Sequence, residues 1–376
     1  LSGSGRYTRY TDELGNQIPA TVLPPGQSAA IILREKEVAT LNGTLLAPID
    51  LNGELWAALA AAQAGYRGER AREWATLLEQ QLAAVRAYFQ LLEAQRLHQV
   101  TAQTIAVDRE QLAHAEALLG SGRATKNDTL VARVALSAAE QQLRQRELAI
   151  RQSKWLLNQL IGRSIDAPTT IADVQQRPVL PAVEQVLQSA HQHNPLLLTL
   201  LEELQRLEAN ATALRRGRLP RFYGGGAFDY TSSDILQPQE MASGYIGFSW
   251  DLGTDTRREA QIAQAQAALD QTRLVLERQL REIEAAVRTT YEAAAERLSA
   301  LDSAAAAVSQ AEENLRIRQQ QYTAGRAQSD DVLSAEALLA QQRATLAGAI
   351  YQAQTRRAEL QQLMGLPIED LLPEWR

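Results

Sequence analysis

The feature that most constrains the fold of this chain is a stretch without glycine or proline, from Thr254 to Ala324. Apolar residues recur in it at heptad spacing, which is typical of a helix packed along its length against other helices. At about 1.5 Å per residue, the stretch predicts a helix on the order of 100 Å long. A helix of that length does not fit inside a compact globular domain. The two heptad series are Ile262, Leu269, Leu276, Ile283 and Leu280, Val287, Ala294, Leu301, Val308, Leu315.

The second feature is an internal repeat. The segments "GSGRATKNDTL" (Gly120 to Leu130) and "TAGRAQSDDVL" (Thr323 to Leu333) align with an offset of 203 residues between Gly122 and Gly325. The same offset relates "LIG", which ends at Gly162, to "LMG", which ends at Gly365. Self-similarity at a fixed spacing indicates a duplicated architecture.

Each half of the repeat predicts a long helical hairpin. The first half has its own long helical stretch, about Glu54 to Leu119, and after each glycine turn a second helix returns, from Thr125 to Ile161 and from Ser329 to Met364. Thr125 and Ser329 are the expected N-caps, because their hydroxyls can accept a backbone hydrogen bond in the first turn. Shorter helices are expected at about 182–193 and 195–216.

A strand-like segment precedes each long helix. Residues alternate between apolar and small or polar in 243–252 and in 41–51, and earlier strands rich in glycine and aromatics occupy 221–231 and 3–11. Four strands of about ten residues have the length that crosses a bilayer at a barrel tilt. Four strands cannot close a barrel, so a membrane role requires several chains. The expected membrane-facing residues are Ile246, Phe248, Trp250, Leu45 and Ile49.

Composition excludes several classes of function. The net charge is −6 with no basic block, which argues against a nucleic-acid partner, and the chain has no cysteine. The closest pair of histidines, His191 and His193, lacks a metal-like partner set, and "GGG" at 224–226 lies within a strand pattern and not in a phosphate loop. We therefore expect no enzyme, no cofactor and no bound metal.

The predicted organisation follows from these elements. A first β-hairpin is expected at 1–52, a first helical hairpin at 53–162, an irregular segment with shorter helices at 163–217, a second β-hairpin at 218–252, a second helical hairpin at 253–365 and a tail at 366–376. The first half lacks a counterpart of the shorter helices. We therefore expect the native precursor to extend upstream of Leu1 and to carry a signal peptide there.

The combination of these motifs resembles one family. Duplicated halves of two strands, a long helix, a glycine turn and a returning helix ending in "L.G" are similar to the TolC-like outer-membrane efflux family, as are Pro220 before the glycine-rich strand and "AEENL" at 311–315. The resemblance implies a mixed α and β fold. In it, three chains pool four strands each into a twelve-stranded membrane β-barrel, continued by a helical tunnel, an α-barrel, through the periplasm.

The resemblance also implies a function. The homotrimer would be a passive exit duct in the outer membrane of a Gram-negative bacterium, in contact with outer-membrane lipid, and served by an inner-membrane pump through a periplasmic adaptor. The alternatives left open are a duct dedicated to type I protein secretion and a soluble coiled-coil scaffold, which would also show heptads. The strand pairs argue against the scaffold.

The two glycine turns are the expected tips of the tunnel. By resemblance, the adaptor-contacting candidates are Gly122, Ala124, Thr125, Gly325, Ala327 and Ser329. The family carries acids at positions i and i+3 after the second turn; here Asp331 matches the first position, Ser334 stands at the second, and Asp330 adds a further acid.

Three copies of Asp331 near one axis would repel one another, which should raise their pKa and favour cations in the constriction. Asp128, Arg326 and Tyr322 are the remaining candidates for the gate. The alternative for both Asp128 and Asp331 is that they are first-turn acids favoured by the helix dipole.

Overall fold

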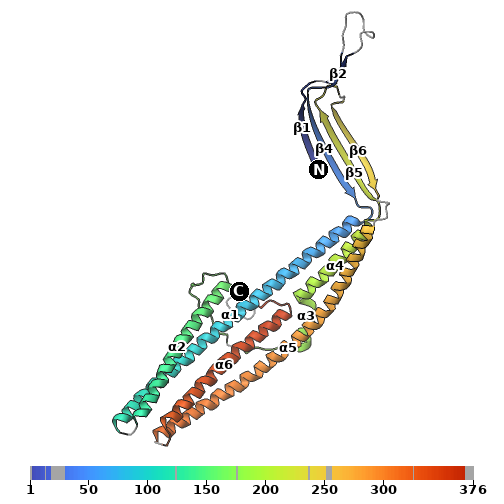
Figure 1. The fold of residues 1–376 in the computed structure, drawn as a ribbon. Coiled ribbons are helices and arrows are strands. Elements are labelled where there is room, and N and C mark those ends of the chain that lie inside the picture. Colours follow the sequence, from blue (N-terminus) through green and yellow to red (C-terminus); the bar gives the residue numbers. More distant parts are fainter. Residues whose placement is uncertain are drawn as a thin grey trace, which may run out of the picture. The chain divides into compact units, whose positions relative to one another are not determined.

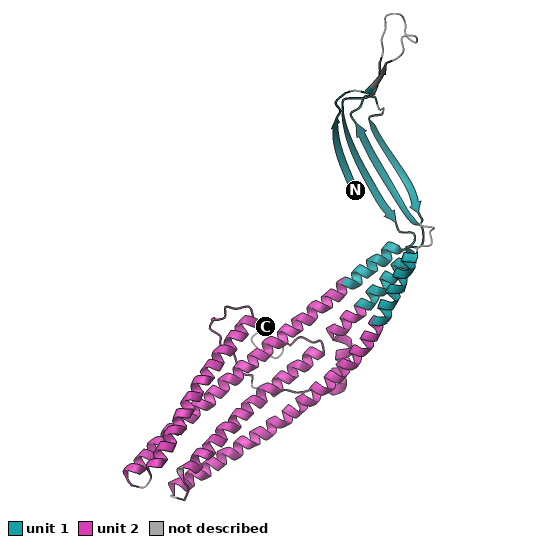
Figure 2. Ribbon diagram, viewed as in Figure 1, with its two compact units in different colours: residues 1–65, 203–271 teal, residues 66–202, 272–376 magenta. Residues whose placement is uncertain are grey.

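The computed structural model describes residues 2–12, 14–17, 30–122, 125–174, 177–235, 238–250, 256–324 and 326–368. The chain divides into two compact units, residues 1–65 with 203–271 and residues 66–202 with 272–376 (Figure 2).

The first unit contains a four-stranded antiparallel sheet. Its strands are β1 (Ser2–Arg9), β4 (Glu37–Ile49), β5 (Arg221–Thr231) and β6 (Glu240–Ser249), in the order β1-β4-β5-β6 (Figure 1). The central pair brings together strands far apart in the sequence, since Leu45 lies opposite Gly226. One strand pair from each half of the repeat thus forms a single sheet, as the sequence predicts.

Two details of the sheet region differ from the sequence prediction. A short second sheet, β2 (Leu14–Gln17) with β3 (Ala30–Arg34), lies between β1 and β4 in the chain and was not expected. The last strand was expected to continue to Leu252, but β6 ends at Ser249 and residues 251–255 lie outside the described residues.

The remaining elements are helices, and three of them have residues in both units. The long helices are α1 (Glu54–Gly120) and α5 (Thr256–Thr323), and the returning helices are α2 (Lys126–Leu160) and α6 (Ser329–Leu363). The shorter helices are α3 (Val183–His193) and α4 (Pro195–Arg216). In the second unit each returning helix runs antiparallel to its long helix, so two helical hairpins stand beside each other (Figure 1).

Two ion pairs within the hairpins occupy equivalent positions in the two halves of the repeat. Arg109 on α1 pairs with Glu140 on α2 at 3.0 Å, and Glu312 on α5 pairs with Arg343 on α6 at 2.8 Å. The two pairs are related by the repeat offset, because 312 corresponds to 109 and 343 to 140, but the signs of the charges are exchanged. The geometry of the hairpin was kept while each partner changed its charge. Such exposed pairs each contribute about 0.2–1 kcal/mol.

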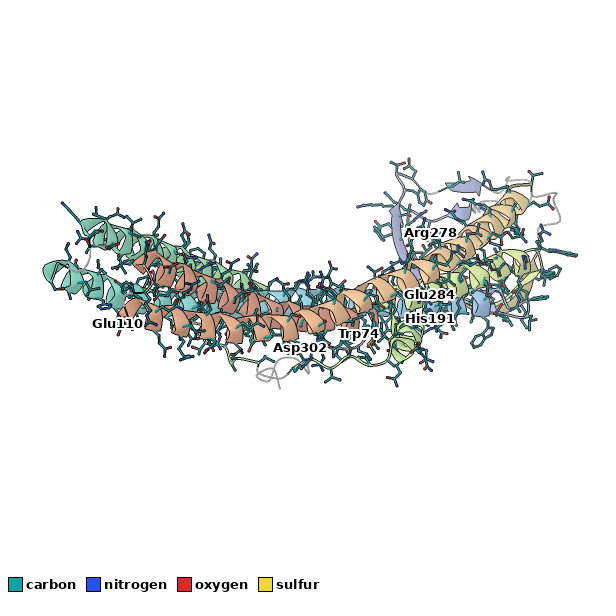
Figure 3. All side chains as sticks on the ribbon, turned by 90° about the horizontal axis from the view of Figure 1, so that it is seen from below. Trp74, Glu110, His191, Arg278, Glu284 and Asp302 are labelled. Atoms are coloured by element: carbon teal, nitrogen blue, oxygen red, sulfur yellow. The ribbon has the colours of Figure 1, made fainter. Side chains whose placement is uncertain are left out.

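Apolar packing in the second unit falls into two clusters. The first is centred on Phe89 of α1, whose ring stacks on Tyr351 of α6 at 6.3 Å between centroids. In the second cluster α3 covers α5, where Val186 packs with Val287. His191 on α3 faces Glu284 on α5, with 3.4 Å between Nε2 and Oε1 (Figure 3).

Only some of the residues in the predicted heptad series of α5 are buried. Val287 and Ala294 are buried as the second heptad series predicts, but further along α5 the buried residues are Ala304 and Ala311. A straight helix of 3.6 residues per turn drifts by about 20° per heptad, so a strict seven-residue series leaves the packed face. The small alanine side chains let neighbouring helices approach closely.

The "L.G" motif ends both returning helices in the same way. After α2, the N–H of Arg163 donates to the carbonyl of Asn158 at 2.9 Å. After α6, the N–H of Leu366 donates to the carbonyl of Gln361 at 3.1 Å. Both glycines are left-handed, with φ of 71° at Gly162 and 72° at Gly365. This is the Schellman arrangement that satisfies the last carbonyls of a helix.

The two glycines differ in their surroundings. A Cβ on Gly162 would meet no atom within 4 Å, whereas a Cβ on Gly365 would lie 2.0 Å from the carbonyl oxygen of His193. The end of α6 is held there by other elements, since Asn194 Nδ2 donates to the Leu363 carbonyl at 2.9 Å and Trp74 Nε1 to that of Gly365 at 3.1 Å.

In the first unit, the ends of the strands are tied to the adjoining helical turns. Arg221, the first residue of β5, forms a two-pronged ion pair with Glu54, the first residue of α1. Arg216 at the end of α4 donates to the Gly53 carbonyl at 2.9 Å. Because two-pronged arginine–carboxylate contacts fix orientation as well as distance, they hold the strand end against the helix start.

Within the described residues, no helix is both long enough and apolar enough to span a bilayer. No group of three or more His, Cys, Asp or Glu side chains in the described part of the chain could hold a metal ion.

We predict that Gly365→Ala lowers the stability of the protein more than Gly162→Ala does. Left-handed backbone costs an alanine about 1–2 kcal/mol at either position. Only at Gly365 must the Cβ also displace the backbone at His193. Thermal unfolding of the two purified variants compares them, and equal losses of melting temperature would contradict the assignment.

Candidate functional site

One face of the four-stranded sheet is apolar and exposed. Ile246 and Phe248 on β6 are 84% and 63% exposed, and Leu45 and Ile49 on β4 are exposed as well. The pairing register places Phe222 opposite Phe248 and Ile49 opposite Phe222, so these side chains share a face. Exposed apolar side chains on one continuous face mark a surface that contacts lipid or protein.

Trp250, the fifth expected member of this face, follows the last residue of β6. Its Nε1 donates to the Arg218 carbonyl at 3.1 Å, and its ring is half exposed. An indole with one wet end and one apolar end suits the boundary between a membrane and water.

The opposite face of the sheet carries mostly polar and small side chains, together with the exposed Leu46 and Met241. Asn42 on β4 donates to Asp229 on β5 across this face. A Cβ on Gly225 would lie 2.6 Å from the ring of Tyr245, and one on Gly247 would lie 2.7 Å from that of Tyr223. The glycines therefore leave room for two tyrosine rings to lie flat on the sheet. This accounts for Gly225 of the glycine-rich strand, whereas Gly224 and Gly226 lie on the apolar face.

The two outer strands of the sheet are β1 and β6. Each offers one row of backbone groups that no other described strand pairs. In a lipid environment such open edges are forbidden, because unpaired backbone N–H and C=O groups cost several kcal/mol each.

The first hairpin turn is an exposed glycine tip. Gly122 has φ of 75°, its N–H donates to the Leu119 carbonyl at 3.0 Å, and a Cβ there would meet nothing within 4 Å. Thr125 is the N-cap of α2 as predicted. Its N–H donates to Asp128 Oδ2 at 2.7 Å, and the N–H of Asp128 donates back to the Thr125 hydroxyl at 3.3 Å. This reciprocal capping box starts the returning helix.

The second hairpin turn repeats this arrangement with one difference from the prediction. The N-cap of α6 is Gln328 and not Ser329, which is already the first residue of the helix. The N–H of Gln328 donates to Asp331 Oδ2 at 3.0 Å, as that of Thr125 does to Asp128. The aspartate at N3 sets where the helix begins, so the cap falls three residues before it.

The structure therefore gives the two matched acids a local role. Asp128 and Asp331 each accept the N–H of an N-cap, which is the first-turn alternative left open by the sequence. Asp330 is exposed beside Asp331. Both tips lie at the same end of the second unit (Figure 1). A role of these acids in a constriction stays a prediction.

The other tip candidates are placed as follows. Tyr322 on α5 packs edge-on against His114 on α1, with 5.5 Å between ring centroids, so it joins the two hairpins. Arg326 is exposed, and among the described residues no ion pair joins it to Asp128. Ala327 is half-buried, and of Ser329 only the backbone is described. Ala124 and Gly325 lie outside the described residues.

Two buried acids above the tips were not singled out by the sequence. Asp108 on α1 and Glu336 on α6 are 5% and 7% exposed. Burial, and secondly the nearby Asp108, raise the pKa of Glu336 to about 7, and burial also raises the pKa of Asp108. In the sequence, Asp108 and Glu336 look like ordinary polar residues of a long helix. Only the packing of one hairpin against the other shows that they are enclosed.

The fold and this site define a class of protein. The chain has a four-stranded sheet with one exposed apolar face and two long helical hairpins that end in turns. The family model described as "Outer membrane efflux protein" matches residues 34–163 and 186–366. The chain belongs to this outer membrane efflux protein family, whose members are channel proteins and not enzymes.

Solved structures show the same fold. The outer membrane protein VceC from Vibrio cholerae superposes with a TM-score of 0.77 at 18% identity, over 98% of this chain and 86% of VceC. CusC gives a TM-score of 0.77 at 18% identity over 97% and 82% of the two chains. The CmeC outer membrane channel of Campylobacter jejuni gives 0.74 at 15% identity over 98% and 79%. No curated protein sequence matches the chain.

We predict that the stability of the protein falls as the pH rises through about 7 and that Glu336→Gln removes part of this fall. The folded state raises the pKa of Glu336 above its usual value of 4.5, so the protonated carboxyl favours folding. This contribution is complete below the usual pKa and is lost as the pH rises through the folded pKa. Melting temperatures at about pH 5 and about pH 8 measure the effect.

Glu110→Gln is the matched control for Glu336→Gln, because Glu110 is exposed on α1 (Figure 3). Its profile should follow that of the wild type. A Glu336→Gln profile indistinguishable from the Glu110→Gln profile would show that Glu336 is not buried as an acid.

Proposed function

We propose that three copies of the chain form an exit duct in the outer membrane of a Gram-negative bacterium. The observation that supports this is the four-stranded sheet, which is open at β1 and β6 and exposes one apolar face. Lipid requires a closed sheet, and twelve strands from three chains would close it. Family membership supports the outer-membrane location.

The polar face of the sheet would line the duct. Residues Asn42 and Asp229 and the tyrosine rings over Gly225 and Gly247 would then face water, while Ile246 and its neighbours would face lipid. No shaped pocket is required on the lining, because a passive duct only conducts. Its cargo is selected by the pump that feeds it.

The helical hairpins would continue the duct through the periplasm towards a pump. In this proposal the exposed tips at Gly122 and around Ala327 contact a periplasmic adaptor, which connects the trimer to an inner-membrane pump. A tip of glycine and small residues lets a partner helix approach the backbone closely. These partners are the ones that the family resemblance implies.

Three copies of Asp331 would meet near the axis of the trimer at the tips. Each carboxylate accepts a cap hydrogen bond, and a ring of three such acidic side chains would favour cations. Asp128 at the first tip would add three more charges. The constriction would therefore be cation-selective.

Conductance in planar lipid bilayers tests the duct, and Asp331→Asn tests the constriction. Asparagine keeps an oxygen that can accept the Gln328 N–H and removes the charge, so the tip should fold while cation selectivity falls severalfold. Asp331→Glu keeps the charge and should retain selectivity.

The outcomes separate the two parts of the proposal. A wild-type protein that never conducts would refute the duct. Conductance with unchanged selectivity in Asp331→Asn would leave the duct standing and remove Asp331 from the constriction.

A further inference from the structure

A cluster of arginines lies at the end of the sheet where β4 and β6 stop. The start of α1, the end of α4 and the start of α5 meet there, all within the first unit (Figure 1). The segment 215–221 contains four arginines and no acidic residue, and two more arginines lie in the first turn of α5. The arginine cluster consists of Arg215, Arg216, Arg218, Arg221, Arg257 and Arg258.

Two glycines bring parts of the cluster close to the backbone. Arg216 donates to the Gly53 carbonyl at 2.9 Å, and Arg258 donates to the Gly217 carbonyl at 2.6 Å. A Cβ on Gly53 would lie 2.3 Å from Nη1 of Arg216, and one on Gly217 would lie 3.2 Å from the carboxylate of Glu54. These two arginines therefore hold defined positions at the end of α4 and the start of α5.

Two other arginines of the cluster are held by carboxylates. Arg221 forms the two-pronged ion pair with Glu54, and Nη2 of Arg218 lies 3.5 Å from Oε1 of Glu259. The side chains of Arg218 and Glu259 are both largely exposed. Because exposed ion pairs are weak, Arg218 can turn towards a different anion at little cost.

Three further arginines keep their charge available. In the described part of the chain, no carboxylate forms an ion pair with Arg215, Arg216 or Arg257, and all three side chains are exposed. Two more acids of this region, Asp251 and Asp255, lie outside the described residues. Exposed guanidinium groups gathered at one end of the sheet attract an anion, and a guanidinium can bind a phosphate through two parallel hydrogen bonds.

Exposed apolar side chains stand beside the arginines. The indole of Trp250 donates to the Arg218 carbonyl at 3.1 Å, and the next residue, Leu219, is exposed. Leu51 and Trp56, which follow β4 in the chain, are 69% and 68% exposed. A free inorganic anion makes no use of such side chains. A phospholipid does, because its phosphate is attached to glycerol and acyl chains.

The order of residues along the sheet shows which part of a lipid would lie here. The apolar face that carries Ile246 and Phe248 ends at Trp250, and Arg218 lies directly beside that indole. Membrane proteins place aromatic rings at the boundary of the hydrocarbon and long cationic side chains just outside it. With the apolar face in lipid, the arginine cluster is therefore at the depth of the phosphate groups.

We propose that the arginine cluster binds the headgroup of an anionic phospholipid, in the leaflet on the side of the helices. The lipid phosphate would accept hydrogen bonds from the exposed guanidinium groups, and its glycerol and first acyl carbons would lie against Trp250 and Leu219. This inference rests on the proposed function, because it takes the apolar face of the sheet to lie in a membrane. Binding of this kind would fix the depth of the sheet in the bilayer.

Quenching of tryptophan fluorescence by brominated lipids measures this preference, because Trp250 adjoins the arginine cluster and bromine quenches only at close range. We would reconstitute the full chain in phosphatidylcholine bilayers that contain a small fraction of either dibrominated phosphatidylglycerol or dibrominated phosphatidylcholine. The wild type should bind the anionic lipid severalfold more tightly, since basic side chains at a membrane surface attract anionic headgroups. Sodium phosphate, added at constant ionic strength, should not change this preference.

The test variant combines Arg215→Gln with Arg257→Gln. It removes two guanidinium groups that no described carboxylate pairs with and leaves the hydrogen bonds to Gly53 and Gly217 in place, so it should lose the preference. Its quenching by brominated phosphatidylcholine should stay that of the wild type, which shows that the sheet is still inserted.

Arg144→Gln combined with Arg151→Gln is the matched control. This pair removes the same charge from exposed positions of α2 in the second unit. The control should keep the preference of the wild type for phosphatidylglycerol.

The outcomes separate this inference from the proposed duct. Absence of quenching by either brominated lipid in the wild type would refute both, because the sheet would not contact lipid. Equal quenching by the two lipids, or a preference that the Arg215→Gln and Arg257→Gln variant keeps, would overturn the lipid site and leave the duct standing. Loss of the preference in sodium phosphate would also overturn it, because the cluster would then take a free anion.

Discussion

The rest of this structure depends on the pairing of backbone groups at the edges of one sheet. In water, the outer strands β1 and β6 would be hydrated at their edges; in lipid they have no such partner. The apolar face that carries Ile246 and Phe248 suits lipid and not water. A single chain therefore cannot satisfy both requirements at once. In the proposed trimer, association of the chains through these edges removes the conflict.

The helical hairpins give the chain long elements that are stable without a globular core. Each long helix is stabilised by a returning helix, and the ends are defined by residues with specific backbone roles. Glycines at 162 and 365 end the returning helices, and aspartates at 128 and 331 begin them. The ion pair Arg109–Glu140 and its charge-reversed counterpart join the two helices of each hairpin at equivalent positions. The duplicated halves have kept these constraints and changed most other residues.

Much of this fold could be predicted from the sequence because its elements are long and have clear start and stop residues. The helix bounds at Glu54 and Thr323, and the cap at Thr125, follow from glycine, threonine and the absence of breakers. The end of β6 was misplaced because the apolar alternation continues through Trp250, beyond the last ladder pair. Ser329 was misplaced as a cap because a serine is the commoner N-cap, whereas here Asp331 places the cap at Gln328.

The candidate sites were less accessible to sequence reasoning for a physical reason. Whether an acid is enclosed depends on which faces of two hairpins meet, and Asp108 and Glu336 are separated by more than two hundred residues in the chain. The repeat made Asp128 and Asp331 stand out, and the structure shows that both accept the N–H of an N-cap. Their collective charge would exist only in an assembly, which a single chain does not contain.

Cysteine cross-linking of the sheet edges tests the central claim most directly, because the native chain has no cysteine. Ser4→Cys on β1 would be combined in turn with Met241→Cys, Ser243→Cys and Tyr245→Cys on β6, since these positions lie on one face of the sheet. After oxidation in lipid, the account predicts that at least one pair gives disulfide-linked species that stop at three chains. Monomers from every pair, or a ladder that continues beyond three chains, would contradict it.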